Sequence, residues 1–273
     1  HRCQHQHTVP YQGWMTKQQR TVLITGASSG IGKATAQLLL LNGWKVIAAA
    51  RRTDAMNDLH ASGAEIFRLD ITDIHSRQSL VTHVHAQFGV LDALINNAGF
   101  GEVGPIETMP LQTAQRLFDV NVFGLIGLTQ MILSEMRKHG EGRIINVSSI
   151  AGRFVTPGSG WYAASKFAVE ALSDALRLEL QQFGIKVVII EPGLIATGFE
   201  NIAKPSMAHA QSDPAWSKMM RKVEQNWLEG FRSASPANVV AKTIKKALDA
   251  RDPKARYRCG HRAESVVIQR LLP

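Results

Sequence analysis

Two polar residues four positions apart interrupt an apolar helical stretch: Tyr162 and Lys166 in GWYAASKFAVEA. At that spacing both side chains project from one helix face, so the ammonium lies near the phenol and favours its ionised form. A phenol with an ordinary pKa of about 10 exchanges protons at neutral pH only when positive charge stabilises its anion. The pair therefore suits acid/base chemistry, although the same spacing also occurs in plain surface pairs.

A second candidate site is the glycine-rich stretch TGASSGIG, Thr25 to Gly32, between a predicted strand and a predicted helix. Gly26, Gly30 and Gly32 permit positive φ and a close approach of backbone to ligand. The N-terminus of the following helix offers free N–H groups to a pyrophosphate. The G-x-x-x-G-x-G spacing differs from the commoner dinucleotide pattern, so a tight structural turn is the alternative.

The end of the second predicted strand, AAARR, bears on which nucleotide would bind. A free ribose 2′-hydroxyl usually meets Asp or Glu at this point, whereas a 2′-phosphate calls for a cation. Ala50 offers no acceptor, and Arg51 and Arg52 supply guanidinium groups that match phosphate. Two arginines after a strand can be merely solubilising, but with the carboxylate missing they favour NADP(H) over NAD(H).

These residues need a scaffold, and from Arg20 the chain repeats a short apolar run followed by a helical stretch. The apolar runs are TVLIT, WKVIAAA, EIFRLD, LDALIN, GRIINVSS and IKVVIIEPG. Continuous β-branched runs separated by helices predict parallel strands covered on both faces. We therefore expect an α/β fold, a doubly wound Rossmann-type parallel sheet with helices on both faces, in which Pro192 and Gly193 end a strand where a ligand crevice opens.

The domain boundaries follow from length and regularity. The 273 residues, 45% of them hydrophobic, suffice for one substantial core, so we expect a single domain over residues 20–273. Residues 1–19 lack the apolar core of a secretory signal, and we interpret them as an extension that is disordered or foreign to the natural chain, since Met15 resembles a natural start. Residues 198–234 break the alternation and predict an irregular helical insertion, either a packed cap or a mobile substrate lid.

Charge and cysteine content exclude several functions. The net charge of +9 is concentrated at the two ends of the chain, within residues 1–20 and 242–270. Without interleaved aromatic residues, such charge favours solvated faces over a nucleic-acid groove. Only two cysteines are present, too few for a disulfide framework, which suggests a reducing compartment and a cytoplasmic protein.

Membrane and metal functions are not expected either. The longest apolar runs, residues 38–41 and 46–50, fall far short of the roughly 18 residues of a membrane-spanning helix. We therefore expect no integral membrane segment. Cys3, His5 and His7 can bind a metal adventitiously, and no functional metal is expected.

Further motifs occur in a fixed order between Arg20 and Thr197. They are TGASSGIG, Asp70 in RLDITD, NNAG at Asn96 to Gly99, Asn121 in DVNVFG, NVSS at Asn146 to Ser149, Tyr162 with Lys166, and PG followed by Thr197. Each alone is a modest signal. Together they resemble the short-chain dehydrogenase/reductase family in its compact single-domain branch.

The resemblance implies a catalytic group of four residues. Tyr162 would be the general acid or base, and Lys166 would supply positive charge and hydrogen-bond the cofactor ribose. The family serine lies thirteen residues before the tyrosine, which selects Ser149 to hold the substrate oxygen. Asn121, inside a long helix, would position a water in a proton relay to Lys166. Taken singly, each residue also has a purely structural interpretation, such as a strand-end cap or a backbone bridge.

The resemblance also implies the cofactor contacts. Asp70 would contact adenine, Asn97 to Gly99 would line the adenine-side ribose, and Thr197 would reach the nicotinamide carboxamide. The complete predicted set is Gly26, Ser28, Ser29, Gly30, Ile31, Gly32, Arg51, Arg52, Asp70, Ile71, Asn97, Ala98, Gly99, Tyr162, Lys166, Pro192, Gly193 and Thr197.

The expected activity is NADP(H)-dependent interconversion of a secondary alcohol and a carbonyl in a small molecule. An apolar pocket lining favours a lipophilic ketone, either steroid-like or an acyl-chain alcohol; its expected members are Phe100, Val103, Phe154, Val155, Trp161 and Phe199. A nucleotide-binding regulator that lost turnover is the alternative. Family members associate through the helices expected at 111–139 and 160–183, so a homodimer or homotetramer is anticipated.

Overall fold

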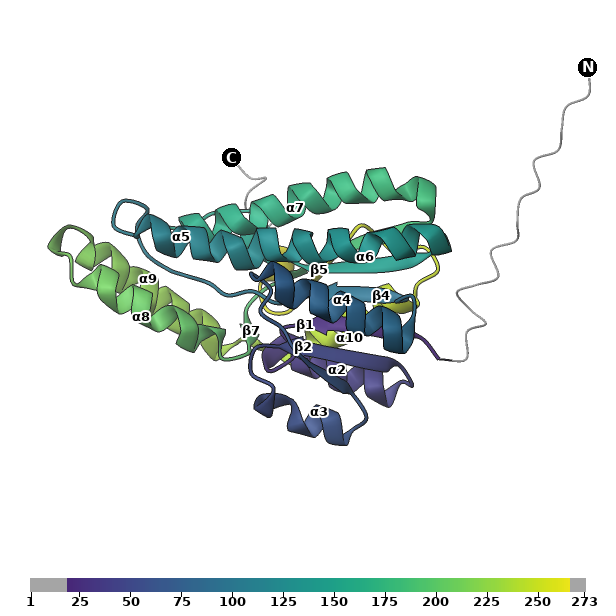
Figure 1. The fold of residues 1–273 in the computed structure, drawn as a ribbon. Helices are drawn as coiled ribbons and strands as arrows, with labels where there is room; N and C mark the ends of the chain where they lie inside the picture. Colours follow the sequence, from purple (N-terminus) through teal and green to yellow (C-terminus); the bar gives the residue numbers. More distant parts are fainter. Residues whose placement is uncertain (1–18, 266–273) are drawn as a thin grey trace, which may run out of the picture.

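The computed structural model describes residues 19–265, with the side chains of residues 199–204 excepted. The predicted N-terminal extension therefore lies almost wholly outside the described residues, together with Cys3, His5 and His7. Figure 1 shows a central sheet between two layers of helices, with one helical pair projecting from the body.

Seven parallel strands form the central sheet, in the order β3-β2-β1-β4-β5-β6-β9. Their bounds are β1 Thr21–Thr25, β2 Lys45–Ala50, β3 Glu65–Arg68, β4 Ala93–Asn96, β5 Gly142–Val147, β6 Ile185–Pro192 and β9 Arg256–Cys259. The chain starts at β1, runs outward to β3, and then crosses to β4 on the other side. Strand order thus reverses between β1 and β4, and ligands of such sheets bind outside the carboxyl ends of the strands at that point. The predicted doubly wound fold is confirmed.

Alternate residues along the strands supply two hydrophobic cores, one on each face of the sheet. Val22 and Ile24 of β1 belong to one core and Leu23 to the other, and all three are fully buried. Parallel strands need this two-sided burial, which explains why they appear in the sequence as uninterrupted apolar runs.

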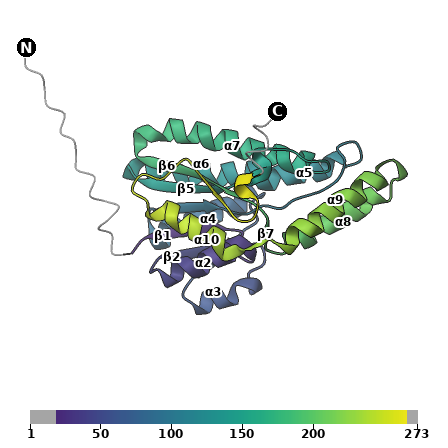
Figure 2. The ribbon, with the colours of Figure 1, turned by 180° about the vertical axis from the view of Figure 1, so that it is seen from behind.

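Two sets of helices cover these faces. On the face of Val22 lie α2 (Gly30–Leu41), α3 (Asn57–Ala61) and α10 (Ala237–Asp249). A short turn at Asp54–Met56 leads into α3. On the face of Leu23 lie α4 (Ile74–Phe88), α6 (Leu125–His139) and α7 (Gly160–Leu180), the last extended by a turn at Gln181–Phe183. Figure 2 shows α10 and α2 side by side.

The predicted long helix at 111–139 is observed as three joined segments. They are α5 (Leu111–Phe118), a π-helical turn η2 (Asp119–Gly124) and α6. By length and composition this helix is able to cross a membrane, and it is the one such helix in the described part of the chain. The sequence analysis missed it because glycine, threonine and serine interrupt its apolar runs. Its inner face is packed in the core, where Leu128, Ile132 and Met136 are buried, as in a core helix of a soluble protein.

The insertion at 198–234 is more regular than predicted. It folds into two helices, α8 (Phe199–Gln211) and α9 (Pro214–Arg232), that project together from the body (Figure 1). Short strands β7 (Ile195–Ala196) and β8 (Ser235–Pro236) pair at the base of this arm. The prolines of this segment suggested an irregular structure. Pro214 occupies the first turn of α9, where proline is tolerated, whereas Pro205 lies inside α8, which continues through it. Whether the arm is a cap or a lid stays a prediction.

Candidate active site

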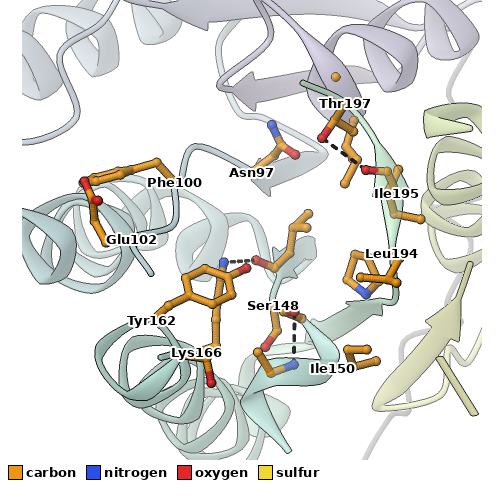
Figure 3. Close-up of a pocket in the computed structure, with 18 of the residues that line it drawn as sticks. Asn97, Phe100, Glu102, Ser148, Ile150, Tyr162, Lys166, Leu194, Ile195 and Thr197 are labelled. Carbon is orange, nitrogen blue, oxygen red and sulfur yellow. Dashed lines mark hydrogen bonds between the residues drawn. The ribbon is translucent and has the colours of Figure 1, made fainter. Parts of the chain in front are cut away.

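A cavity of about 1640 Å³ opens at the carboxyl ends of the strands. Pockets for a single small molecule usually measure about 300–1,000 Å³, so this one has room for a dinucleotide beside a second molecule. Its lining includes Ser149 and the whole predicted cofactor set except Gly32. Asn121 and Gly32 are not among the lining residues. Figure 3 shows the cavity between the start of α7, the segment after β6 and the end of β4.

The glycine loop packs too tightly to accept side chains. A Cβ atom at Gly32 would lie 2.5 Å from Asn97 Nδ2 and 2.5 Å from the Gly26 carbonyl oxygen. Gly26 has φ of +67°, a conformation that residues with a Cβ rarely adopt. Ser29, which lies between them, is the extended residue just before the first turn of α2, where backbone N–H groups are free to meet an anion. The shape of the loop is therefore suited to holding a phosphate group.

Thr25, which the sequence analysis did not select, fixes this loop to β4. Its Oγ1 accepts hydrogen bonds from the backbone N–H groups of Asn97 and Ala98, each at 3.0 Å. Asn97 Nδ2 in turn donates to the carbonyl oxygens of Thr25 and Gly26 at 3.0 and 3.3 Å. Asn97 thus holds the loop with its side chain while lining the cavity. The sequence feature that could have pointed to Thr25 is a threonine at the end of an apolar strand.

The end of β2 forms a cationic margin of the cavity. Arg51 and Arg52 are exposed, and Arg52 Nη2 donates a hydrogen bond to Ser29 Oγ at 3.4 Å. Asp70 lines the same region, where the Thr72 hydroxyl donates to its carboxylate at 2.7 Å. That hydrogen bond, aided by the charge of Arg51, holds the pKa of Asp70 below its usual value. Two cations and one carboxylate thus border the place where the adenine ribose would lie.

Tyr162 and Ser149 meet at the cavity wall. Tyr162 projects from the first turn of α7 toward the cavity (Figure 3), and the Ser149 side chain lies near its hydroxyl on the same wall. Ser149 is held in turn by the backbone N–H of Ala151, which donates to Ser149 Oγ at 3.1 Å. Burial raises the pKa of Tyr162 to about 12, and the neighbouring Ser149 side chain opposes that shift.

Lys166 lies beneath Tyr162 on the same face of α7, as the spacing predicted. Its Nζ atom is 5.9 Å from the centroid of the Tyr162 ring and donates a hydrogen bond to the Val147 carbonyl oxygen at 3.0 Å. Burial lowers the pKa of Lys166 to about 8, and the negative charge of Glu170 opposes that change. The Tyr162 hydroxyl is thus less acidic in this structure than an ordinary tyrosine, because burial outweighs the effect of the Ser149 side chain on its pKa.

Asn121 sits in the π-helical turn η2, between α5 and α6. Such turns widen a helix locally and often occur at functional sites. Its Nδ2 atom donates to the Phe100 carbonyl at 3.0 Å and to Ser165 Oγ at 3.1 Å, while its Oδ1 atom accepts from the Phe100 N–H at 3.1 Å. A Cβ at Gly99 would lie 3.1 Å from Asn121 Oδ1 and 3.7 Å from Lys166 Nζ. Asn121 and Lys166 therefore border one small space.

The segment after β6 closes the cavity opposite Tyr162. A Cβ at Gly193 would lie 2.1 Å from the His261 carbonyl oxygen, so this turn packs directly against the chain that follows β9. Thr197 approaches the glycine loop, since a Cβ at Gly30 would meet Thr197 Cβ at 2.9 Å. The two ends of the predicted cofactor site thus touch one another.

The other half of the cavity is largely apolar, but its lining differs from the prediction. Phe100, Phe154 and Val155 line it as expected. Val103 instead packs inside the arm with Met207 and Met220, and Trp161 packs edge-on against Phe118, with ring centroids 6.4 Å apart. The Phe199 side chain lies outside the described residues. The lining also includes residues that the sequence did not point to, among them Glu102, Arg116, Lys222, Val223, Asn226, Glu229, Phe231 and Arg262.

Comparisons with known proteins agree with this geometry. A family model described as short chain dehydrogenase matches residues 20–207. The chain is 39% identical over 257 residues to the Uncharacterized oxidoreductase YbbO of Escherichia coli (strain K12), covering 93% of this chain and 91% of that protein. It is 34% identical to a 3-ketodihydrosphingosine reductase of Bacteroides thetaiotaomicron, covering 89% and 88% of the two chains. It is also 34% identical to an NADPH-dependent 3-dehydrocapnine reductase of Ornithobacterium rhinotracheale, covering 87% of each.

Solved structures resemble the fold over nearly its whole length. A short-chain dehydrogenase from Streptomyces avermitilis superposes with a TM-score of 0.83 at 33% identity, covering 94% of this chain and 93% of that one. A serine dehydrogenase complexed with NADP+ superposes with a TM-score of 0.77 at 25% identity, covering 88% and 94%.

Proposed function

The chain belongs to the short-chain dehydrogenase family, and from this premise we propose that it is an NADP(H)-dependent oxidoreductase that interconverts a secondary alcohol and a carbonyl. The observation that carries the proposal is that Tyr162 and Ser149 lie together on the wall of the same cavity that the glycine loop lines. A proton donor and a phosphate cradle thus share one space. This arrangement suits a reaction that moves a hydride and a proton together.

Each residue of the site has a role in carbonyl reduction. A bound reduced nicotinamide supplies the hydride that the carbonyl carbon accepts. Ser149 hydrogen-bonds the carbonyl oxygen, and Tyr162 donates its hydroxyl proton to that oxygen as the new C–H bond forms. Lys166 stabilises the resulting phenolate by its positive charge.

Proton return would pass through the space beside Gly99. That space adjoins both Asn121 Oδ1 and Lys166 Nζ, so a water held there would pass a proton toward the phenolate. In alcohol oxidation the same groups act in reverse, with the Tyr162 phenolate as the base.

The preference for NADP(H) rests on the end of β2. Ala50 leaves no carboxylate for a ribose 2′-hydroxyl, and Arg51 and Arg52 stand exposed beside the Ser29 hydroxyl. Guanidinium groups form charge-assisted hydrogen bonds with phosphate. The NADPH-dependent relative and the NADP+ complex of the serine dehydrogenase support this assignment.

The substrate we propose is a lipophilic ketone or alcohol. Beyond Tyr162 the cavity is lined by aromatic and aliphatic groups from the loop after β5 and from α9, among them Phe154, Val155, Val223 and Trp227. One relative acts, by its name, on 3-ketodihydrosphingosine. An acyl-chain ketone therefore fits better than a steroid-like one.

The decisive test is turnover with a panel of ketones of increasing chain length, using NADPH and NADH in parallel. Wild-type protein should oxidise NADPH in the presence of a lipophilic ketone, and Tyr162→Phe should lose about 10²- to 10⁴-fold in kcat while still binding NADPH. NADPH binding without any Tyr162-dependent turnover would favour the nucleotide-binding regulator instead.

We further propose that the protein is a cytoplasmic homodimer or homotetramer. Phe123 in η2 and Leu172 and Leu178 on α7 are exposed apolar side chains on the two predicted contact helices. Burying them against a second copy would remove apolar surface from water. Sedimentation of wild type and Phe123→Asp tests this: the substitution should yield a monomer.

A further inference from the structure

Two carboxylates are buried beside the candidate active site and take no part in the reaction proposed above. Glu170 on α7 is 4% exposed and Glu191 on β6 is 0% exposed. A buried carboxylate is costly unless cations or hydrogen bonds compensate it. Two of them next to each other need a specific arrangement of positive charge.

Three arginines from two separate parts of the chain supply that charge. Arg256 Nε, on β9, lies 3.0 Å from Glu170 Oε2 and 3.3 Å from Glu191 Oε1. Arg258 Nε, on the same strand, lies 2.8 Å from Glu191 Oε2. Arg153, just after Ser149 in the chain, lies 4.0 Å from Glu170 and 3.7 Å from Glu191. The strand β9 thus contributes two of the cations that hold these carboxylates.

Glu170 is packed next to Lys166 and next to the loop that carries Ser149. It follows Lys166 by four residues on α7, so both side chains leave the same helix face, and both are buried. A Cβ at Gly152 would lie 2.9 Å from Glu170 Cγ, 2.9 Å from Ser148 Oγ and 3.1 Å from the Lys166 carbonyl oxygen. The loop that carries Ser149 therefore closes directly over Glu170.

We propose that Glu170 is a positioning residue of the reaction: its buried carboxylate, held ionised by Arg256 from β9, keeps the ammonium of Lys166 charged beneath Tyr162. The proposal deepens the proposed function and rests on it for its kinetic consequence. Without Glu170, Lys166 would be a buried cation whose nearest described polar contact is the neutral Val147 carbonyl.

The electrostatics around Glu170 fix the direction of the effect. Burial lowers the pKa of Lys166, and Glu170 opposes that lowering. Burial and the Glu191 charge raise the pKa of Glu170 itself, whereas the nearby Ser148 hydroxyl and the Arg256 hydrogen bond lower it. The charged groups that face Glu170 are Lys166 and Asp174 from α7, Glu191 from β6, Arg153 from the loop after β5, and Arg256 from β9.

Removing the carboxylate should therefore lower the pKa of Lys166, so that the ammonium loses its proton at a lower pH. The test compares wild type with Glu170→Gln, and adds Arg256→Met, which removes the closer of the two cations that the buried carboxylates share and favours protonation of Glu170. Asp174→Asn is the matched control, because Asp174 also pairs with Arg256 but lies two helical turns from Lys166.

Two measurements are made on each folded variant. Titration of ¹³Cε-lysine by NMR, with the Lys166 signal assigned by its absence in Lys166→Arg, reports the lysine without any turnover. The pH profile of kcat/KM for NADPH-dependent ketone reduction reports its consequence. Glu170→Gln and Arg256→Met should each shift the Lys166 titration and the alkaline limb by about one pH unit downward, which is about a fivefold loss of activity at pH 8, whereas Asp174→Asn should match wild type.

An unchanged Lys166 titration in Glu170→Gln overturns the proposal, whatever the kinetics. If wild type reduces no ketone, the proposed function fails, while the NMR titration still decides whether Glu170 holds the lysine charged. Should Glu170→Gln fail to fold, Arg256→Met carries the same prediction.

Discussion

Lys166 donates its ammonium hydrogen bond to the carbonyl oxygen of Val147, the last residue of β5, at 3.0 Å. This contact ties the catalytic helix α7 to the strand end that leads into Ser149. In the proposed mechanism the lysine therefore acts on Tyr162 through its charge rather than through a direct hydrogen bond. On that proposal its protonation state sets how well the phenolate is stabilised.

We predict an alkaline limit to ketone reduction. Burial lowers the pKa of Lys166 to about 8. The charged form that stabilises the phenolate is present below that pH and is lost above it. The value of kcat/KM for NADPH-dependent reduction should therefore fall with an apparent pKa of about 8 in wild type.

The variant Lys166→Met tests whether Lys166 causes this alkaline fall in kcat/KM. It should be slower at every pH by about 10²-fold or more and should show no limb near pH 8. A wild-type profile that stays level up to pH 10 would contradict the assignment of the limb to Lys166.

Cofactor preference should depend on the two arginines after β2. Arg51 and Arg52 border the cavity beside Ser29, and each charge-assisted hydrogen bond to phosphate contributes about 1.5–3 kcal/mol. The double variant Arg51→Ala with Arg52→Ala should raise KM for NADPH by about 10- to 100-fold or more and leave KM for NADH within about twofold. A wild-type preference for NADH in steady-state kinetics would refute this role.

The fold could be predicted from the sequence because parallel strands buried on both faces appear as uninterrupted apolar runs. Strands β1 and β6 are two examples, since each coincides with such a run in the sequence. The cofactor loop could be predicted for a similar reason, since Gly26 and Gly32 occupy positions where a Cβ does not fit. Local chemistry at these positions leaves few alternatives.

The substrate half of the cavity could not be predicted in the same way. Trp161 and Val103 are apolar residues next to the site in the chain, yet the first packs on Phe118 and the second inside the arm. Sequence proximity does not tell which side of a helix or loop an apolar residue covers. The buried pairing of Glu170 with Arg256 was equally invisible, because it joins residues 86 positions apart.

Gly32 should be essential to cofactor binding for steric reasons. An added Cβ would lie 2.5 Å from Asn97 Nδ2 and from the Gly26 carbonyl oxygen, so Gly32→Ala must displace the loop that Asn97 holds. Gly104→Ala is the matched control, since its Cβ would meet its nearest neighbour, Met109 Cε, at an ordinary 3.5 Å. Calorimetry should show NADPH affinity reduced at least about tenfold in the first variant and little changed in the second. Equal affinities would argue against a tight cradle.

Arg143 should be a large contributor to stability. It is 1% exposed on β5, and its Nη1 atom donates to the Ala247 carbonyl at 2.6 Å while Nη2 donates to the carbonyl of Ala250. It therefore binds the last carbonyls of α10, where the helix dipole favours a cation. Arg143→Met should lower the free energy of unfolding by about 3 kcal/mol, seen as a lower midpoint in urea at unchanged m-value. A change below 0.5 kcal/mol, roughly the effect of an ordinary surface substitution, would contradict it.

Recognition of the substrate chain should depend on Trp227 of α9. Its ring stacks on Phe231, with centroids 5.0 Å apart, and both residues line the cavity. Replacing it with alanine removes a large apolar contact that only a long substrate can reach, because the contact lies on the arm while Tyr162 lies on the body. Trp227→Ala should therefore raise KM about tenfold for a long-chain ketone and leave a short ketone unaffected. Leu228→Ala is the control, since Leu228 is 46% exposed and absent from the described lining, and it should behave as wild type with both substrates. A uniform loss with long and short ketones alike would instead mean that the arm supports the catalytic group and does not measure the length of the substrate.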